Sequence, residues 1–175
     1  MERRISSYVG RQIELYQAIK ALDDRVNPNP LIHVKGIDHI GKSRFVEQVC
    51  YHFYRHNKFR QVVILQDMME IDSHAAFQEK MVMIQKHADQ HPRLEASNSI
   101  DSLEIGNQQD EEAVILHPEP VILMAFTNVD CLTKDQWSRF ESKLLDIYLS
   151  RQNIRFIVTT NHRPKLKFSH FLDEA

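Results

Sequence analysis

Short apolar runs alternate with helical patterns along this chain. Four runs of five or six residues are rich in β-branched side chains and end near polar or turn-forming residues. They span residues 31–35, 61–66, 121–126 and 154–159. Because each run is almost continuously apolar, it is typical of a strand that helices cover on both faces of a parallel sheet. A shorter run within 165–175 predicts a fifth strand.

Between these runs, apolar residues recur at the spacing of one helical face. The resulting order of strands and helices predicts an α/β fold with three layers and a mostly parallel sheet of four to five strands. The three predicted helical stripes consist of Phe45, Val46, Val49, Cys50 and Phe53; of Phe77, Met81, Ile84 and Ala88; and of Trp137, Phe140, Leu144 and Ile147.

Composition agrees with a compact domain and excludes several classes of protein. At 175 residues and 42% hydrophobic content, the chain predicts a single domain with one good core. A net charge of −2 gives no basic surface for nucleic acid. Two cysteines are too few for a disulfide framework and favour a reducing compartment. With neither a membrane-spanning apolar run nor a signal peptide, we expect a soluble cytoplasmic protein.

The run that follows the first predicted strand matches the phosphate-binding pattern Gly-x-x-x-x-Gly-Lys-Ser/Thr at every fixed position. Such a loop points successive backbone N–H groups at phosphates, and the following helix adds the positive end of its dipole. We expect Lys42 to reach the β- and γ-phosphates, Ser43 to ligate Mg²⁺ and Arg44 to belong to the same segment. The alternative is an ordinary glycine turn that opens a helix. The motif consists of Gly36, Ile37, Asp38, His39, Ile40, Gly41, Lys42 and Ser43.

Two residues inside the loop depart from the commonest form of the motif. Asp38 and His39 stand where additional glycines are frequent, and both residue types tolerate left-handed backbone geometry. The Asp38 carboxylate must point away from a bound phosphate, because its charge would oppose binding. Some GTPases also carry Asp-His before Gly-Lys, but they need an Asn-Lys-x-Asp motif that residues 127–130 do not provide.

Other segments resemble the signal-transduction ATPases with numerous domains (the STAND class, which includes NB-ARC and NACHT modules) and their AAA+ relatives. Gly10, Arg11, Glu14 and Leu15 match the Gly-Arg-x-x-Glu-Leu opening of that class. The resemblance implies that Val9, Gly10 and Arg11 lie beside the adenine of ATP or ADP. The alternative for Gly10 and Arg11 is a simple helix start.

In the same class, the third strand ends in an acid that holds Mg²⁺ (the Walker B acid). Here the family pattern Leu-Asp-Asn-Val-Asp corresponds to residues 126–130, and Thr127 stands at the first acid. A threonine hydroxyl supplies no negative charge, which puts efficient hydrolysis in doubt. Asp130 is a candidate catalytic substitute, and the alternative is that it caps the next turn or helix.

The fourth run continues into Thr159, Thr160 and Asn161. AAA+ proteins place an asparagine at this point to sense the γ-phosphate, so the resemblance implies that catalytic role for Asn161. A loop-capping asparagine is the alternative. Arg163 could reach a phosphate instead, although an exposed arginine is the ordinary expectation.

We expect four parts within one nucleotide-binding domain over residues 1–175. Residues 1–30 hold a helix and the segment beside the adenine, 31–90 the phosphate-binding half, and 121–175 the half with Thr127 and Asn161. The polar stretch 91–120 between them is read as disordered, with a functional insertion as the alternative. STAND and AAA+ modules continue into a lid, which we expect to be absent here. The acids of the stretch are Glu95, Asp101, Glu104, Asp110, Glu111 and Glu112.

Three functions remain open at this point. The first is a signal-transduction switch that binds ATP or ADP with Mg²⁺ and hydrolyses slowly or not at all. The second is a competent ATPase that uses Asp130. The third is a degenerate phosphate-loop domain that serves as an interaction module. Besides nucleotide, we expect other protein domains or self-association as partners, and neither membrane nor nucleic acid.

Overall fold

Five parallel strands form the centre of the molecule. The computed structural model describes residues 10–25, 29–56, 62–69, 71, 73–89, 122–161 and 169–173. Within them, the strands form one sheet in the order β2-β3-β4-β1-β5, and every neighbouring pair is parallel. The strands are β1 (Leu31–Lys35), β2 (Val62–Asp67), β3 (Ile122–Thr127), β4 (Ile154–Thr160) and β5 (Ser169–Asp173).

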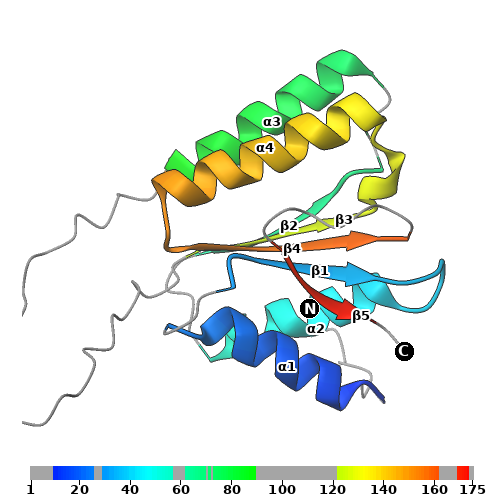
Figure 1. Ribbon diagram of the computed structural model, residues 1–175, viewed down its shortest axis with the longest axis vertical. Coiled ribbons are helices and arrows are strands. Elements are labelled where there is room, and N and C mark those ends of the chain that lie inside the picture. Colours follow the sequence, from blue (N-terminus) through cyan, green and yellow to red (C-terminus); the bar gives the residue numbers. More distant parts are fainter. Residues whose placement is uncertain are drawn as a thin grey trace, which may run out of the picture.

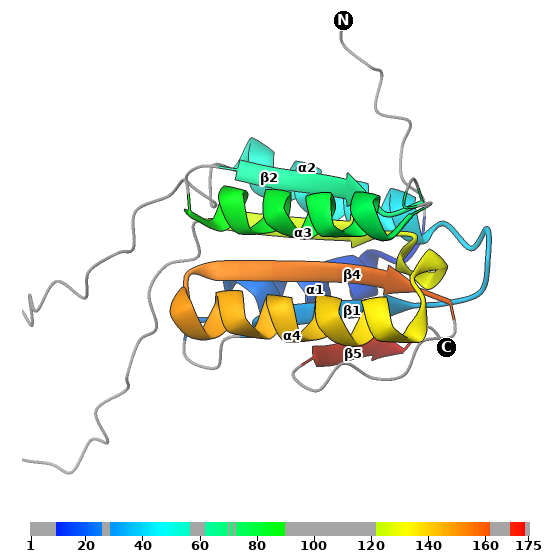
Figure 2. The same cartoon turned by 90° about the horizontal axis from the view of Figure 1, so that it is seen from above.

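Helices cover both faces of this sheet. Figure 1 shows α3 and α4 side by side on one face and α1 and α2 on the other. Figure 2 shows α4 and α3 running along the strands. The predicted three-layer α/β fold is therefore confirmed, including its fifth strand. The helices are α1 (Gln12–Asp23), α2 (Lys42–Arg55), α3 (His74–Asp89) and α4 (Lys134–Ser150).

The sheet separates two hydrophobic clusters. Alternate residues of a strand point to opposite faces, so Phe156 and Val158 join the cluster beneath α3 and α4, whereas Ile157 joins the cluster beneath α1 and α2. Every residue of the three predicted helical stripes is buried in one of these clusters. The apolar periodicity therefore identified the inward faces of α2, α3 and α4 correctly.

Three strands extend one residue further than the apolar runs predict. Asp67, Thr127 and Thr160 end β2, β3 and β4 at the same edge of the sheet. Polar residues can end a strand here because the carboxyl edge of a parallel sheet carries the loops that lead into the helices. Of these residues, Thr160 lies next to the loop after β1, because its carbonyl accepts from Gly36 N at the start of that loop.

Other predictions fall on residues outside the described ranges. These are the adenine-side role of Val9, the phosphate role of Arg163 and the reading of 91–120 as disordered. Among the described helices, none is both long and apolar enough to span a membrane.

Two buried groups have displaced pKa values. Desolvation is the main reason that the pKa of the Cys50 thiol rises to about 12, and the nearby Glu47 charge raises it further. The thiol therefore stays protonated and is a poor nucleophile. Burial also lowers the pKa of Arg155, whose Nη1 donates to the carbonyls of Gln152 (2.7 Å) and Ile154 (3.1 Å). A fully buried arginine in an apolar strand was not predicted.

We predict that Thr133→Ala lowers the free energy of unfolding by about 1 kcal/mol. Thr133 forms a capping box at the start of α4: Gln136 N donates to Thr133 Oγ1 (3.3 Å), and Thr133 N donates to Gln136 Oε1 (2.8 Å). Urea unfolding measures the change. Thr133→Ser keeps the acceptor and should stay close to the unmodified chain, whereas an unchanged midpoint for Thr133→Ala would contradict the capping role.

Candidate phosphate-binding site

The loop after β1 is held against the neighbouring strand before it turns into α2. Gly36 N donates to Thr160 O at the end of β4 (3.1 Å). The chain then passes through His39 in the left-handed region (φ 63°) and Gly41 (φ 95°), where α2 begins. The structure thus confirms that histidine tolerates left-handed geometry in this loop. Gly36 has no such φ, so only the second glycine of the motif requires glycine for its backbone angle.

Lys42 folds back over this loop. Its Nζ donates to Gly36 O (2.9 Å) and Ile37 O (2.8 Å). An ammonium group therefore lies within the curve of the loop, next to the start of α2. The first turn of a helix has N–H groups without intrahelical acceptors, and Gly41 offers no side-chain cap for them. Ser43 lies in this first turn. A cation and a helix N-terminus together favour an anion.

Asn161 connects the loop to the end of the third strand. Its backbone N donates to Asp130 Oδ2 (2.7 Å), and its side-chain Nδ2 donates to Asp38 Oδ1. Asp38 is thereby directed toward Asn161. Asp130 lies in a short 3-10 helix, η1 (Val129–Cys131), and the helix after it is capped by Thr133. Asp130 therefore does not cap α4, whereas the alternative that it caps a turn stays a prediction.

Thr127, at the position where the resemblance predicts an acid, is almost fully buried, and its carbonyl accepts a hydrogen bond from Met68 N (3.0 Å). The neighbouring strand β2 ends in an acid that the sequence analysis missed. Asp67 is in register with Thr127, and its Oδ1 accepts from Asn128 Nδ2 (2.9 Å) and Met69 N (2.9 Å). Its position directly after the apolar run 61–66, as Thr127 follows 121–126, is the signal that could have identified it.

The sequence analysis also missed a hydrogen-bonded pair of buried side chains on β1 and β4. His33 on β1 and Thr160 on β4 are fully buried, and His33 Nε2 shares a hydrogen bond with Thr160 Oγ1. The histidine ring also lies 6.4 Å from that of Trp137 on α4. A histidine within the apolar run 31–35 was the available signal. The pair joins the two strands at the point where Gly36 leaves the sheet.

The remaining predicted residues in the described part of the chain, Gly10, Arg11 and Arg44, lie at the starts of α1 and α2. Gly10 (φ 103°) and Arg11 (φ 52°) lead into α1, and Arg11 O accepts from Leu15 N (3.0 Å), so the helix-start reading describes their backbone. The start of α1 lies at the same end of the sheet as the carboxyl ends of the strands (Figure 1). Arg44 forms an exposed ion pair with Glu47 (3.3 Å), which contributes little to stability.

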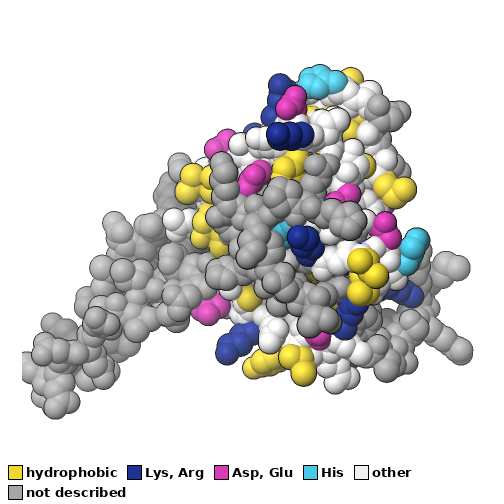
Figure 3. All heavy atoms as spheres, turned by 45° about the vertical axis from the view of Figure 1, so that its right-hand side comes forward, with side chains coloured by type: hydrophobic (Ala, Val, Ile, Leu, Met, Phe, Trp, Pro, Cys, Tyr) yellow, Lys and Arg dark blue, Asp and Glu magenta, His cyan; other side chains and the backbone are white. Residues whose placement is uncertain are grey.

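The surface around the loop mixes chemical types. Ile37 and Ile40 are exposed at 66% and 37%. On the side that Figure 3 brings forward, apolar, basic, acidic and histidine side chains are interspersed. The described residues contain no group of three or more His, Cys, Asp or Glu that could hold a metal ion by itself. Ser43, the residue predicted to bind Mg²⁺, is exposed near the start of α2.

Known proteins resemble this chain only in structure. No family model matches the sequence, and no curated protein matches it. The structure of Rhizobiales Trip13 matches with a TM-score of 0.50 and 11% identity over 86% of this chain and 54% of that one. C. elegans PCH-2 matches with a TM-score of 0.52 and 12% identity over 90% and 39%.

A third match is the replication initiator DnaA bound to AMPPCP and single-stranded DNA, with a TM-score of 0.49 and 15% identity over 93% of this chain and 42% of that one. The chain thus spans about half or less of the solved structures it matches. At these identities the similarity concerns the fold alone: Trip13 and PCH-2 contain an α/β domain that resembles the parallel sheet and flanking helices of this chain.

We predict that Gly41→Ala lowers the free energy of unfolding by about 1–2 kcal/mol, because it forces an L side chain into left-handed geometry. A Cβ at this position would have nothing within 4 Å, so steric contact adds no further penalty. Gly41→Asn is the matched control, since asparagine tolerates positive φ better. Equal losses in urea unfolding for the two variants would contradict an origin in backbone strain.

Proposed function

We propose that this chain binds ATP or ADP with Mg²⁺ and acts as a STAND-like switch domain. The observation that carries the proposal is the position of Lys42 Nζ, which lies against Gly36 O and Ile37 O beside the uncapped start of α2. A phosphate would exchange these two carbonyl contacts for stronger charge-assisted hydrogen bonds. The loop also follows a strand and precedes a helix, which is the structural context that the phosphate-binding motif requires.

The other proposed nucleotide contacts follow the order of the chain. Residues 36–43 surround the phosphates, and Ser43 offers its hydroxyl to Mg²⁺. Arg44, in the first turn of α2, belongs to the same phosphate-binding segment. Gly10 and Arg11 lead into α1, whose start lies at the same end of the sheet as the carboxyl ends of the strands (Figure 1), which is compatible with the proposed adenine contact. Mg²⁺ would supply electrostatic neutralisation of the phosphate oxygens.

The proposal of weak or absent hydrolysis rests on the residues at the ends of β3 and β2. Thr127 supplies no negative charge at the Walker B position, and Asp67 is already hydrogen-bonded to Asn128 and Met69 N. A domain that binds nucleotide without rapid turnover can stay in its ATP-bound or its ADP-bound form for long periods. We propose that its partners are other protein domains or further copies of the chain, which would bind one of these two forms in preference to the other.

A competent ATPase is the second candidate, and the position of Asp130 favours it. Asn161 N fixes the Asp130 carboxylate next to the loop, and the same asparagine contacts Asp38. In this alternative, Asp130 orients the attacking water and Asn161 contacts the γ-phosphate. Phosphate release distinguishes the two functions, since only the ATPase turns over.

The deciding experiment is calorimetric titration of the chain with ATP, ADP and GTP, with and without Mg²⁺, followed by a phosphate-release assay. We expect adenine-selective binding in the micromolar range with little turnover. Lys42→Ala should weaken binding about a hundredfold, because charged hydrogen bonds of this kind contribute about 1.5–3 kcal/mol. Lys20→Ala, at an exposed position of α1, is the control.

Unchanged ATP affinity in Lys42→Ala would contradict the site, and clear turnover in the unmodified chain would favour the ATPase. Absence of binding to every nucleotide would leave the loop as part of an interaction module. Circular dichroism checks that both variants fold.

We also predict that Asp38→Asn binds ATP about three- to tenfold more tightly than the unmodified chain. The substitution keeps an oxygen that can accept from Asn161 Nδ2 but removes a negative charge from the loop that would hold phosphates. The gain should be larger for ATP than for ADP and should shrink at high salt. Weaker ATP binding would instead indicate that the Asp38 charge assists the site, for example through the metal ion.

A further inference from the structure

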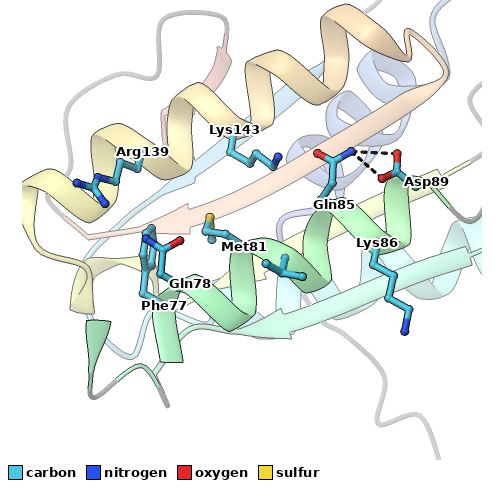
Figure 4. A pocket seen from close by; sticks show the side chains of 9 residues that line it. Phe77, Gln78, Met81, Gln85, Lys86, Asp89, Arg139 and Lys143 are labelled. Atoms are coloured by element: carbon cyan, nitrogen blue, oxygen red, sulfur yellow. Dashed lines mark hydrogen bonds between the residues drawn. The ribbon is translucent and has the colours of Figure 1, made fainter. Parts of the chain in front are cut away.

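A groove runs between α3 and α4 on the outer side of these helices. It encloses about 620 Å³ and lies on the opposite face of the sheet from α2. Figure 4 shows its two sides: Phe77, Met81 and Gln85 come from α3, and Arg139 and Lys143 come from α4. It is therefore separate from the candidate phosphate site.

The floor of the groove is apolar. Phe77 and Met81 belong to the hydrophobic cluster beneath the two helices, and Val82 beside them is 66% exposed. An exposed valine next to two core residues extends the apolar surface out of the cluster and into solvent. Such a surface accommodates an apolar side chain of a ligand, which would remove it from water.

The α4 side of the groove is cationic. Arg139 and Lys143 are one helical turn apart, and neither makes a hydrogen bond or ion pair within the described part of the chain. The acid that lines the groove, Asp89, is already satisfied: Gln85 Nε2 donates to both of its oxygens (2.9 and 3.0 Å), and Arg151 Nη2 donates to Oδ1 (3.0 Å). The groove thus presents two cations that form no ion pair with a described residue, on a chain of net charge −2.

The length of the groove restricts what can fill it. Its α3 side extends from Phe77 to Asp89, which corresponds to about 18 Å at the rise of an α-helix. That length suits about three turns of a helix or five to six extended residues. A compact small molecule would fill only part of it.

We propose that this groove binds an acidic amphipathic segment of a partner protein. An apolar side chain of that segment packs on the exposed Val82 and on the edge of Met81, which is 8% exposed, and its carboxylates pair with Arg139 and Lys143. Charge complementarity and the apolar floor together define the partner, since the cations select carboxylates and the floor supplies an anchor. The assignment does not depend on nucleotide binding.

The test uses fluorescence anisotropy with the full chain and a fluorescein-labelled synthetic dodecapeptide in which Leu and Phe are interspersed with Glu and Asp. We expect saturable binding that weakens at least about tenfold in the double variant R139E/K143E, since close charge pairs at interfaces contribute strongly. The control K20E/K134E makes the same change of net charge at exposed positions away from the groove and should stay within about twofold. Val82→Ser should weaken binding about threefold through lost apolar contact.

Four outcomes would overturn the proposal. Equal weakening in the two double variants would indicate general attraction to charge, and equal binding of a peptide with Lys in place of its acids would remove the charge selectivity. The third concerns the acidic stretch 91–120. If the probe binds only after the acids of that stretch are replaced by Asn and Gln, the chain's own segment is the occupant. If it binds neither form, the groove is not a docking site.

Discussion

The hydrogen bond from Gly36 N to Thr160 O is the contact on which the arrangement of the candidate site depends. It fixes the start of the loop to β4, the strand that lies between β1 and β3 in the sheet. Because β4 occupies that central place, its end is next to both the loop and η1. Asn161, one residue later, can therefore contact Asp38 on one side and Asp130 on the other. The Gly36 anchor and the hydrogen bond from Asn161 Nδ2 to Asp38 Oδ1 together tie the loop to the end of β4.

Parallel strands explain why the polar groups meet at one edge. All five strands point the same way, so every residue that ends a strand lies at the same side of the sheet. The residues there pair across strands: Gly36 with Thr160, Asn128 with Asp67, and Asn161 with Asp130. Each pair satisfies groups that the carboxyl edge would otherwise leave exposed, and together they limit the movement of the loops.

Much of this fold could be predicted from the sequence, because buried apolar residues recur along the chain at the spacing of a helix face or form continuous strand runs. The bounds of β1 and every member of the stripes on α2, α3 and α4 follow from apolar spacing. The loop motif could be predicted because its glycines and lysine stand at fixed separations. Arg155 could not be predicted, since its Nη1 contacts carbonyls of its own strand and the preceding turn, and no pattern in the sequence marks them.

The contacts of the site were harder to predict for a different reason. Asp38 and Asn161 are separated by 123 positions, and Asp67 and Asn128 by 61. Such pairs depend on the order of strands in the sheet, which the sequence pattern leaves open once the strands themselves are identified. Of the two caps considered for Asp130, the one on the next helix is excluded because Thr133, three residues later, forms a complete capping box with Gln136.

The two candidate surfaces are connected through η1. Asp130 in η1 accepts from Asn161 N, and only Leu132 and Thr133 separate Cys131, the last residue of η1, from the start of α4. A ligand that draws the Asn161 side chain away from Asp38 acts on a residue whose backbone holds Asp130. Arg139 and Lys143 follow in the second and third turns of α4. The chain from Asp130 to Arg139 is therefore short, and a measured coupling free energy between the two ligands is the quantity that defines any link between the loop and the α3–α4 groove.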